Sequence, residues 1–175
     1  MALHLIIDGY NLIRRSAPLR EEERQSLELG RSALIEQLAA YKRVRGHKIT
    51  VVFDGAANND DFETNTSEKG IRIRFSRQGQ TADAVIRKMA RREGEKALVV
   101  TADRPLAEAV SAAGAEVVDP GPFEDKMAMA QLAETKGVDP EDEADAGWEP
   151  TTRKKGPAKR SPKRKRRQMR KVKKL

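Results

Sequence analysis

Residues 3–11 read LHLIIDGYN, and this stretch decides the fold. A nearly continuous apolar run ends directly on Asp8, and two later runs end in the same way, ITVVF on Asp54 and ALVVTA on Asp103. Unbroken apolar runs of this length are typical of buried parallel strands, whereas half-exposed strands alternate in polarity. The carboxyl ends of parallel strands line one crevice of an open sheet, where ligands bind. The sequence therefore predicts a crevice lined by carboxylates.

Helical spacing between these runs predicts the rest of the fold. We expect one long helix over about residues 21–45 that ends at Gly46, and further helices from Thr81 to Gly94, through Leu106 to Gly114, and over about 123–136. The remaining expectations are a turn at 9–11, a long loop over 55–70, a half-exposed edge strand over 71–75 and a short last strand over 115–118. Alternating strands and helices indicate an α/β fold with a mostly parallel sheet.

Charge divides the chain into unlike parts. Of its 175 residues, the last 25 hold 14 Lys and Arg and no acid, which leaves 21 basic and 27 acidic residues in the first 150. We expect a folded domain over residues 1–137, an acidic linker over 138–150 and a disordered basic tail over 151–175. The tail is expected to be disordered because like charges repel and it has almost no apolar surface to bury.

The composition restricts the metal chemistry and the location. The chain has no Cys and two His, so a bound metal must be held mainly by oxygen atoms, which suits Mg²⁺ or Mn²⁺. We find no secretory signal, and no run approaches the roughly 20 apolar residues of a membrane span. The expectation is a cytoplasmic protein with no membrane partner.

Each acid also has a structural explanation when it is taken alone. Asp8 and Asp54 precede glycines and suit turns, Asp83 suits the first turn of a helix, and Asp103 suits a helix N-cap. Taken together they repel one another, since two unit charges 4 Å apart cost about 4 kcal/mol at an effective dielectric of 20. Either cations neutralise the group or the acids share protons. Divalent metal binding is the simpler answer at neutral pH.

Metals held by carboxylates activate water and stabilise leaving oxygens in phosphoryl transfer. Other phosphate-handling sites fit worse, because the chain has neither GxxxxGK[ST] nor GxGxxG. Asn11 is placed to hold a phosphate or a metal-bound water, or alternatively to cap a helix or turn. Thr101 lies on the same predicted face as Asp103 and serves either the site or the strand core.

Four motifs resemble the YacP-like branch of the NYN domains, which are relatives of PIN nucleases: DGYN at 8–11, VFDG at 52–55, TAD at 81–83 and TADR at 101–104. The resemblance covers about residues 3–136. It implies a three-layer α/β/α PIN-like domain with a mostly parallel central sheet, and a Mg²⁺- or Mn²⁺-dependent endoribonuclease. A ribosome-associated mRNA endonuclease of this family makes mRNA on translating ribosomes a candidate substrate.

The resemblance assigns roles to the residues of this sequence that stand at the family's motif positions. The resemblance implies that Asp8, Asp83 and Asp103 bind metal and act in catalysis, that Asn11 supports them, and that Asp54 lies at the rim or binds metal through water. Two positions depart from the family pattern. Gln80 and Arg87 stand where the resemblance predicts acids, which implies lower metal affinity. They also favour an alternative, a non-catalytic RNA- or ribosome-binding module with a degenerate pocket.

Basic residues are the candidate RNA contacts: Arg87, Arg104, Lys163, Arg164, Lys165, Arg166 and Arg167. Lys and Arg in a flexible tail bind phosphate by releasing counterions, with almost no sequence information. A solvated tail without a single partner is the other interpretation. The helix face from Arg87 to Arg92 is expected to be a solvated surface as a whole. The oligomeric state is left open.

Overall fold

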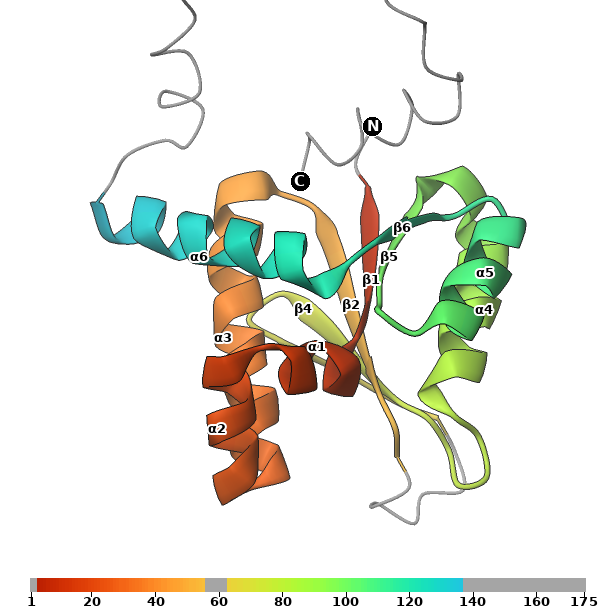
Figure 1. Cartoon of the computed structure of the whole chain (residues 1–175), viewed down its shortest axis with the longest axis horizontal. Coiled ribbons are helices and arrows are strands. Elements are labelled where there is room, and N and C mark those ends of the chain that lie inside the picture. The colour runs from red at the N-terminus through yellow and green to blue at the C-terminus, as the bar shows by residue number, and fades with distance from the viewer. Residues whose placement is uncertain (1–2, 56–62, 137–175) are drawn as a thin grey trace, which may run out of the picture.

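The computed structural model describes residues 3–55 and 63–136, so the predicted linker and tail lie outside the described residues. In this part of the chain a six-stranded sheet has the order β3-β4-β2-β1-β5-β6 (Figure 1). Its strands are β1 (His4–Asp8), β2 (Lys48–Phe53), β3 (Thr64–Glu68), β4 (Ile71–Phe75), β5 (Ala97–Val100) and β6 (Glu116–Val118). The β3–β4 pair is antiparallel and the other four pairs are parallel. The predicted, mostly parallel sheet is confirmed.

Helices cover both faces of the sheet (Figure 1). One face packs against α1 (Gly9–Arg15), α2 (Ala17–Gln25), α3 (Leu27–Arg45) and α6 (Pro120–Lys136). The other face packs against α4 (Ala82–Glu93), which a short 3₁₀ turn (Gly94–Lys96) follows, and against α5 (Arg104–Ala112). This is the three-layer α/β/α arrangement. None of the helices in the described ranges combines the length and apolar character that a membrane crossing requires.

The central strand β1 shows why its apolar run is unbroken. Leu5 and Ile7 face the core under α1, α3 and α6, whereas Ile6 faces the core under α4 and α5. All three side chains are fully buried because both faces of the strand are covered. In the register, Asp8 pairs with Val52 and Ile7 pairs with Val100, so β1, β2 and β5 end at the same edge.

The predicted long helix over 21–45 is wrong, because two helices meet at Ser26. Its backbone is extended (φ −161°, ψ 152°), and its side-chain oxygen caps α3 by accepting a hydrogen bond from the N–H of Leu29 at 3.1 Å. Gly30 allows the two helices to pack closely, since a Cβ there would lie 2.9 Å from Cβ of Glu23. The end at Gly46 is confirmed, with a left-handed φ of 66°.

Four other local predictions need correction. Residues 9–11 are not a turn but the first turn of α1. Residues 64–68 of the predicted loop form β3, which is exposed along its whole length, while residues 56–62 lie outside the described part. Because β3 pairs with β4, the strand at 71–75 is not at the edge of the sheet. The strand before Asp103 ends at Val100, two residues earlier than its apolar run.

Candidate active site

Three helices, α1, α4 and α5, begin at the edge where β1, β2 and β5 end. Two of them, α1 and α5, are capped by acids that the sequence predicts for the site. Oδ1 of Asp8 accepts a hydrogen bond from the N–H of Asn11 at 3.3 Å and caps α1. Oδ1 of Asp103 accepts one from the N–H of Leu106 at 2.7 Å and caps α5. Asp83 lies in the first turn of α4, whose cap is Thr81. The helix N-termini therefore bring partial positive charge to the acids.

Asp54 connects the end of β2 to the start of α4. Its Oδ1 accepts hydrogen bonds from the N–H of Ala82 at 2.9 Å and from the hydroxyl of Ser76 at 3.2 Å. The same hydroxyl oxygen accepts the N–H of Gly55 at 3.0 Å. Asp54 is nevertheless exposed to solvent, which places it at the rim of the site. Its position suits a supporting part rather than a central one.

The side chains of Asn11 and Thr101 both accept hydrogen bonds from backbone N–H groups. Oδ1 of Asn11 accepts a hydrogen bond from the N–H of Ala102 at 3.0 Å, which joins α1 to the connection after β5. Oγ1 of Thr101 accepts one from the N–H of Asp103 at 3.1 Å, and its side chain is buried. Both residues therefore help to position acids at the ends of β1 and β5.

The charges of the four acids act on one another. The pKa of Asp8 is raised from 3.8 to about 6, mainly by burial and in smaller part by the charges of Asp83, Asp54 and Asp103, while the hydrogen bond from the N–H of Asn11 lowers it. Burial and the charges of Asp103 and Asp54 also raise the pKa of Asp83, while Arg87 lowers it. The fold thus brings these acids within electrostatic range, as the strand ends predict.

A hollow of about 420 Å³ lies at this edge, with Asp8, Asn11, Asp54 and Asp83 in its wall. Arg14 and Arg15 from the last turn of α1 also line this hollow, together with Tyr10, Leu27 and Ala82, whereas Asp103 does not. Sequence reasoning missed these two arginines because it interpreted residues 9–11 as a turn, not as the start of a helix that carries them back to the site. Arg104, a predicted RNA contact, is exposed at the first residue of α5.

The donor set suits a hard divalent cation. It consists of oxygen atoms, and Asp8 and Asp103 each use Oδ1 in a helix cap while Oδ2 has no hydrogen bond with a described residue. Among residues 3–55 and 63–136, no three His, Asp or Glu side chains lie close enough together to ligate one ion. Mg²⁺ usually takes one or two carboxylates and keeps several waters. The site fits such a hydrated ion, and direct ligation by all of Asp8, Asp83 and Asp103 stays a prediction.

The sequence pattern of the YacP-like NYN domain matches residues 5–174. The chain belongs to this family. The match begins within β1 and continues past residue 136, where the resemblance of the four motifs ends, into the basic tail. The NYN domain is a nuclease-type domain, and nucleases of the NYN family act on RNA.

Relatives of this NYN domain come from Bacillus subtilis. The protein YacP of strain 168, described as uncharacterized, is 33% identical over 86 residues, which cover 49% of this chain and 50% of YacP. The chain thus aligns with about half the length of this curated relative. The crystal structure of Rae1 (YacP) superimposes with a TM-score of 0.64 at 24% identity, covering 78% of this chain and 79% of Rae1. The crystal structure of a tryptophan-to-leucine variant of Rae1 superimposes with a TM-score of 0.60 at 25% identity, covering 77% of this chain and 78% of the variant. The PIN-like fold is confirmed.

Proposed function

We propose that this protein is a Mg²⁺- or Mn²⁺-dependent endoribonuclease that cleaves phosphodiester bonds of RNA, with mRNA on the ribosome as a candidate substrate. One observation carries the proposal: four acids from four separate segments face one edge of the sheet, and burial together with the other three charges raises the pKa of Asp8 to about 6. Membership of a nuclease-type family supports it.

Asp8, Asp83 and Asp103 are the proposed metal-binding acids, and Asp54 contributes through water. A bound divalent cation would supply an activated water and stabilise negative charge on the phosphate. Asp8 is the central member because it is buried and held by the N–H of Asn11. Above pH 6 its carboxyl is mainly ionised, which is the form that binds cations.

Arg14 and Arg15 provide the opposite charge in the same hollow. Both side chains are exposed, and both lie in the wall that holds Asp8 and Asp83. Arg binds phosphate oxygens through a planar fork of donors. We propose that these two arginines hold the phosphate next to the acids. This assigns binding to α1 and metal chemistry to the strand ends.

The decisive test is Asp8→Asn in the full-length protein with Mn²⁺ present. The exposed acid of α6, Asp125→Asn, is the matched control because Asp125 does not line the acid hollow and its charge is not among those that shift the pKa of Asp8 or Asp83. We expect the control to cleave RNA and to bind Mn²⁺ in a calorimetric titration, and Asp8→Asn to do neither. RNA cleavage by pure Asp8→Asn protein would refute the proposed mechanism.

The tail supplies the proposed general affinity for RNA. It lies outside the described residues, and its candidate contacts are Lys163, Arg164, Lys165, Arg166 and Arg167. Six to ten phosphate contacts lose about 10³–10⁵ in affinity between 50 and 200 mM salt. Removal of residues 151–175 is therefore expected to weaken RNA binding and its salt dependence while cleavage of a short substrate persists. Loss of short-substrate cleavage would assign the tail a part in the chemistry instead.

Arg87 favours a second candidate function, a non-catalytic RNA- or ribosome-binding module. Arg87 stands where the family resemblance predicts Glu, and its charge acts directly on Asp83. Gln80 is also half-buried beside the start of α4 where an acid is predicted. This alternative predicts RNA or ribosome association without metal-dependent cleavage of any RNA, ribosome-bound mRNA included. Mn²⁺ binding by the wild type that Asp8→Asn abolishes would argue against it.

A further inference from the structure

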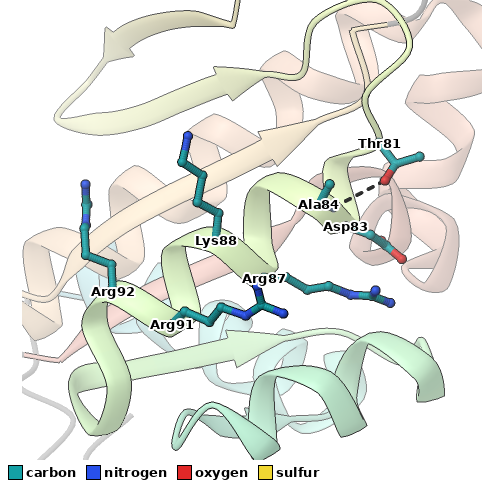
Figure 2. Close-up of a pocket in the computed structure, with 7 residues that line it drawn as sticks. All are labelled: Thr81, Asp83, Ala84, Arg87, Lys88, Arg91 and Arg92. Carbon is teal, nitrogen blue, oxygen red and sulfur yellow. Dashed lines mark hydrogen bonds between the residues drawn. The ribbon is translucent and has the colours of Figure 1, made fainter.

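A second hollow, of about 600 Å³, lies along the exposed side of α4 (Figure 2). Four cations line it, Arg87, Lys88, Arg91 and Arg92. Of the described residues in its wall, only Asp83 is acidic, and the remaining two are Thr81 and Ala84. The surface is therefore strongly cationic at one end and meets the acid site at the other.

Helical spacing arranges these charges in two rows. Asp83, Arg87 and Arg91 follow one another at intervals of four residues, and Lys88 and Arg92 form the neighbouring row. Figure 2 shows Lys88 and Arg92 extending to one side of α4, and Arg87 and Arg91 to the other. At 1.5 Å per residue the row from Asp83 to Arg91 is about 12 Å long. This length exceeds one phosphate, so the hollow suits a chain of phosphates.

Two of these cations lack a charged partner within the described part of the chain. Arg92 pairs with Glu93 at 3.2 Å and the charge of Arg87 acts on Asp83, whereas Lys88 and Arg91 form no ion pair with a described residue. The Nε of Arg87 is buried and has no hydrogen-bond acceptor among the described residues. A buried donor without an acceptor is costly, so movement of this side chain toward a phosphate in the hollow would be favourable. The unpaired charges and the unsatisfied donor both call for an anion.

The hollow shares wall residues with two neighbouring hollows. Asp83 also lines the acid hollow, and Arg92 also lines a third hollow of about 430 Å³. The third hollow adds polar side chains of the β3–β4 hairpin: Asn65, Thr66, Ser67, Arg72 and Arg74. A polar and cationic surface therefore leads from the acids along α4 to the hairpin.

We propose that the α4 hollow binds the phosphate backbone of single-stranded RNA on one side of the cleavage point. This inference rests on the proposed endoribonuclease function and assigns a path to its substrate. An acidic protein fits less well, because the wall offers no apolar or aromatic anchor of the kind that dominates protein interfaces. The lack of aromatic residues in the wall also means that bases are not stacked there. The hollow holds phosphates and does not select a sequence.

The first measurement is the salt dependence of RNA binding in EDTA, by fluorescence anisotropy with the full-length chain in the Asp8→Asn background. Lys88→Gln with Arg91→Gln is expected to make the slope of log K against log salt shallower by about 1.4, from ~0.7 per phosphate contact on a single strand. The matched control, Arg20→Gln with Arg24→Gln, removes two exposed charges from α2 on the other face of the sheet. Equal slopes for the two double variants would overturn the inference.

The second measurement locates the RNA directly. The chain has no Cys, so a single one at Lys88→Cys or at the control position Arg24→Cys can carry a photo-activated cross-linker. We expect cross-linking of a labelled single-stranded RNA from position 88 and not from 24. Unlabelled RNA should compete, and polyglutamate should not. Equal cross-linking from both positions, or equal competition by polyglutamate, would overturn the inference.

These measurements separate the inference from the function on which it rests. Neither requires metal or cleavage. Position-specific cross-linking in a wild-type protein that cleaves no RNA with Mn²⁺ would contradict the endoribonuclease proposal and leave RNA binding along α4 intact. Metal-dependent cleavage with no cross-linking from Lys88→Cys would contradict the α4 path alone.

Discussion

Asn11 and Ala102 are joined across the edge of the sheet, where Oδ1 of the Asn11 side chain accepts a hydrogen bond from the backbone N–H of Ala102 at 3.0 Å. The two residues lie 91 positions apart in the sequence. The bond ties the first turn of α1, which follows Asp8, to the connection that leads into Asp103. Asn11 is thus a positioning residue for two acids on separate strands.

Replacement of Asn11 should therefore disturb the site through geometry. Asn11→Ala leaves the N–H of Ala102 without its acceptor, which costs about 1–3 kcal/mol of unfolding free energy. Asn11→Asp retains an oxygen at that place. We expect Asn11→Ala to lose most RNA cleavage and Asn11→Asp to retain more, measured by single-turnover cleavage beside urea denaturation. Wild-type cleavage by Asn11→Ala would show that the bond does not position the acids.

Substitutions of Asp54 can separate the effect of its hydrogen bonds from the effect of its charge. Its Oδ1 accepts hydrogen bonds from Ala82 and Ser76, and an amide oxygen can replace it in both. Asp54→Asn should keep stability within about 0.5 kcal/mol of wild type, whereas Asp54→Ala should lose about 1–3 kcal/mol. Because Asp54 lies at the rim, Asp54→Asn should reduce cleavage far less than Asp8→Asn. An equal loss in the two Asn variants would make Asp54 a central metal ligand.

Asp8 makes the stability depend on pH. Its pKa is raised from 3.8 to about 6, so the folded state binds a proton more tightly than the unfolded state between those values. The contribution of Asp8 to the free energy of unfolding therefore falls by about 3 kcal/mol as pH rises through this window, at ~1.4 kcal/mol per unit. Asp8→Asn should be more stable than wild type above pH 6 and similar below pH 4, by urea denaturation in EDTA. Identical curves at pH 8 would contradict this.

His4 acts in the opposite direction over a similar window. Burial lowers its pKa from 6.5 to about 4, and its Nε2 contacts the hydroxyl oxygen of Thr50 at 2.8 Å. Between pH 4 and 6.5 the unfolded state binds the proton more tightly, so the stability that neutral His4 contributes is lost as pH falls. The two effects offset each other in the wild type. Asp8→Asn should reveal a stability that rises steadily from pH 4 to 6.5, and a flat profile would contradict the assignment to His4.

Gly9 is predicted to be intolerant of any side chain. A Cβ at this position would lie 2.2 Å from Cε1 of Phe53, under the ring that also packs against Tyr10. Gly9→Ala should lower the unfolding free energy by about 1–3 kcal/mol through overpacking, although Ala favours the helix. Gly121→Ala in α6 is the control, since its nearest atom lies at 3.4 Å. Equal thermal midpoints for the two variants would exclude the clash.

The strand ends were predictable because parallel strands need unbroken apolar runs. As those runs indicate, Asp8 is the last residue of β1 and Asp54 directly follows β2. Asp103 lies three residues after the end of β5. The apolar face of α4 also matches its spacing, and its residues Ala82, Val85, Ile86, Met89 and Ala90 are all buried. Both patterns reflect burial, and burial can be predicted from the sequence because buried positions carry apolar residues.

Features that depend on a distant partner were not predictable. The break at Ser26 needs the close packing of α2 on α3, and Leu27, the first residue of α3, is 43% exposed. Strand β3 has no apolar residue and exists because β4 supplies its hydrogen-bonding partner. The cationic hollow on α4 arises in the same way, since helical spacing alone indicated a solvated face. Its walls and its junction with the acid hollow come from tertiary structure.

The caps have a consequence for how sequences of this family are compared. Asp8 and Asp103 each cap a helix N-terminus, so their loss would lower stability as well as remove the proposed metal ligands, and a relative without catalytic activity would still gain stability by keeping both. Asp83 caps no helix, and its carboxylate forms no hydrogen bond with a described residue. Under the proposed mechanism, selection for folding and selection for chemistry therefore separate at Asp83, and this position would be the most informative marker of an active member.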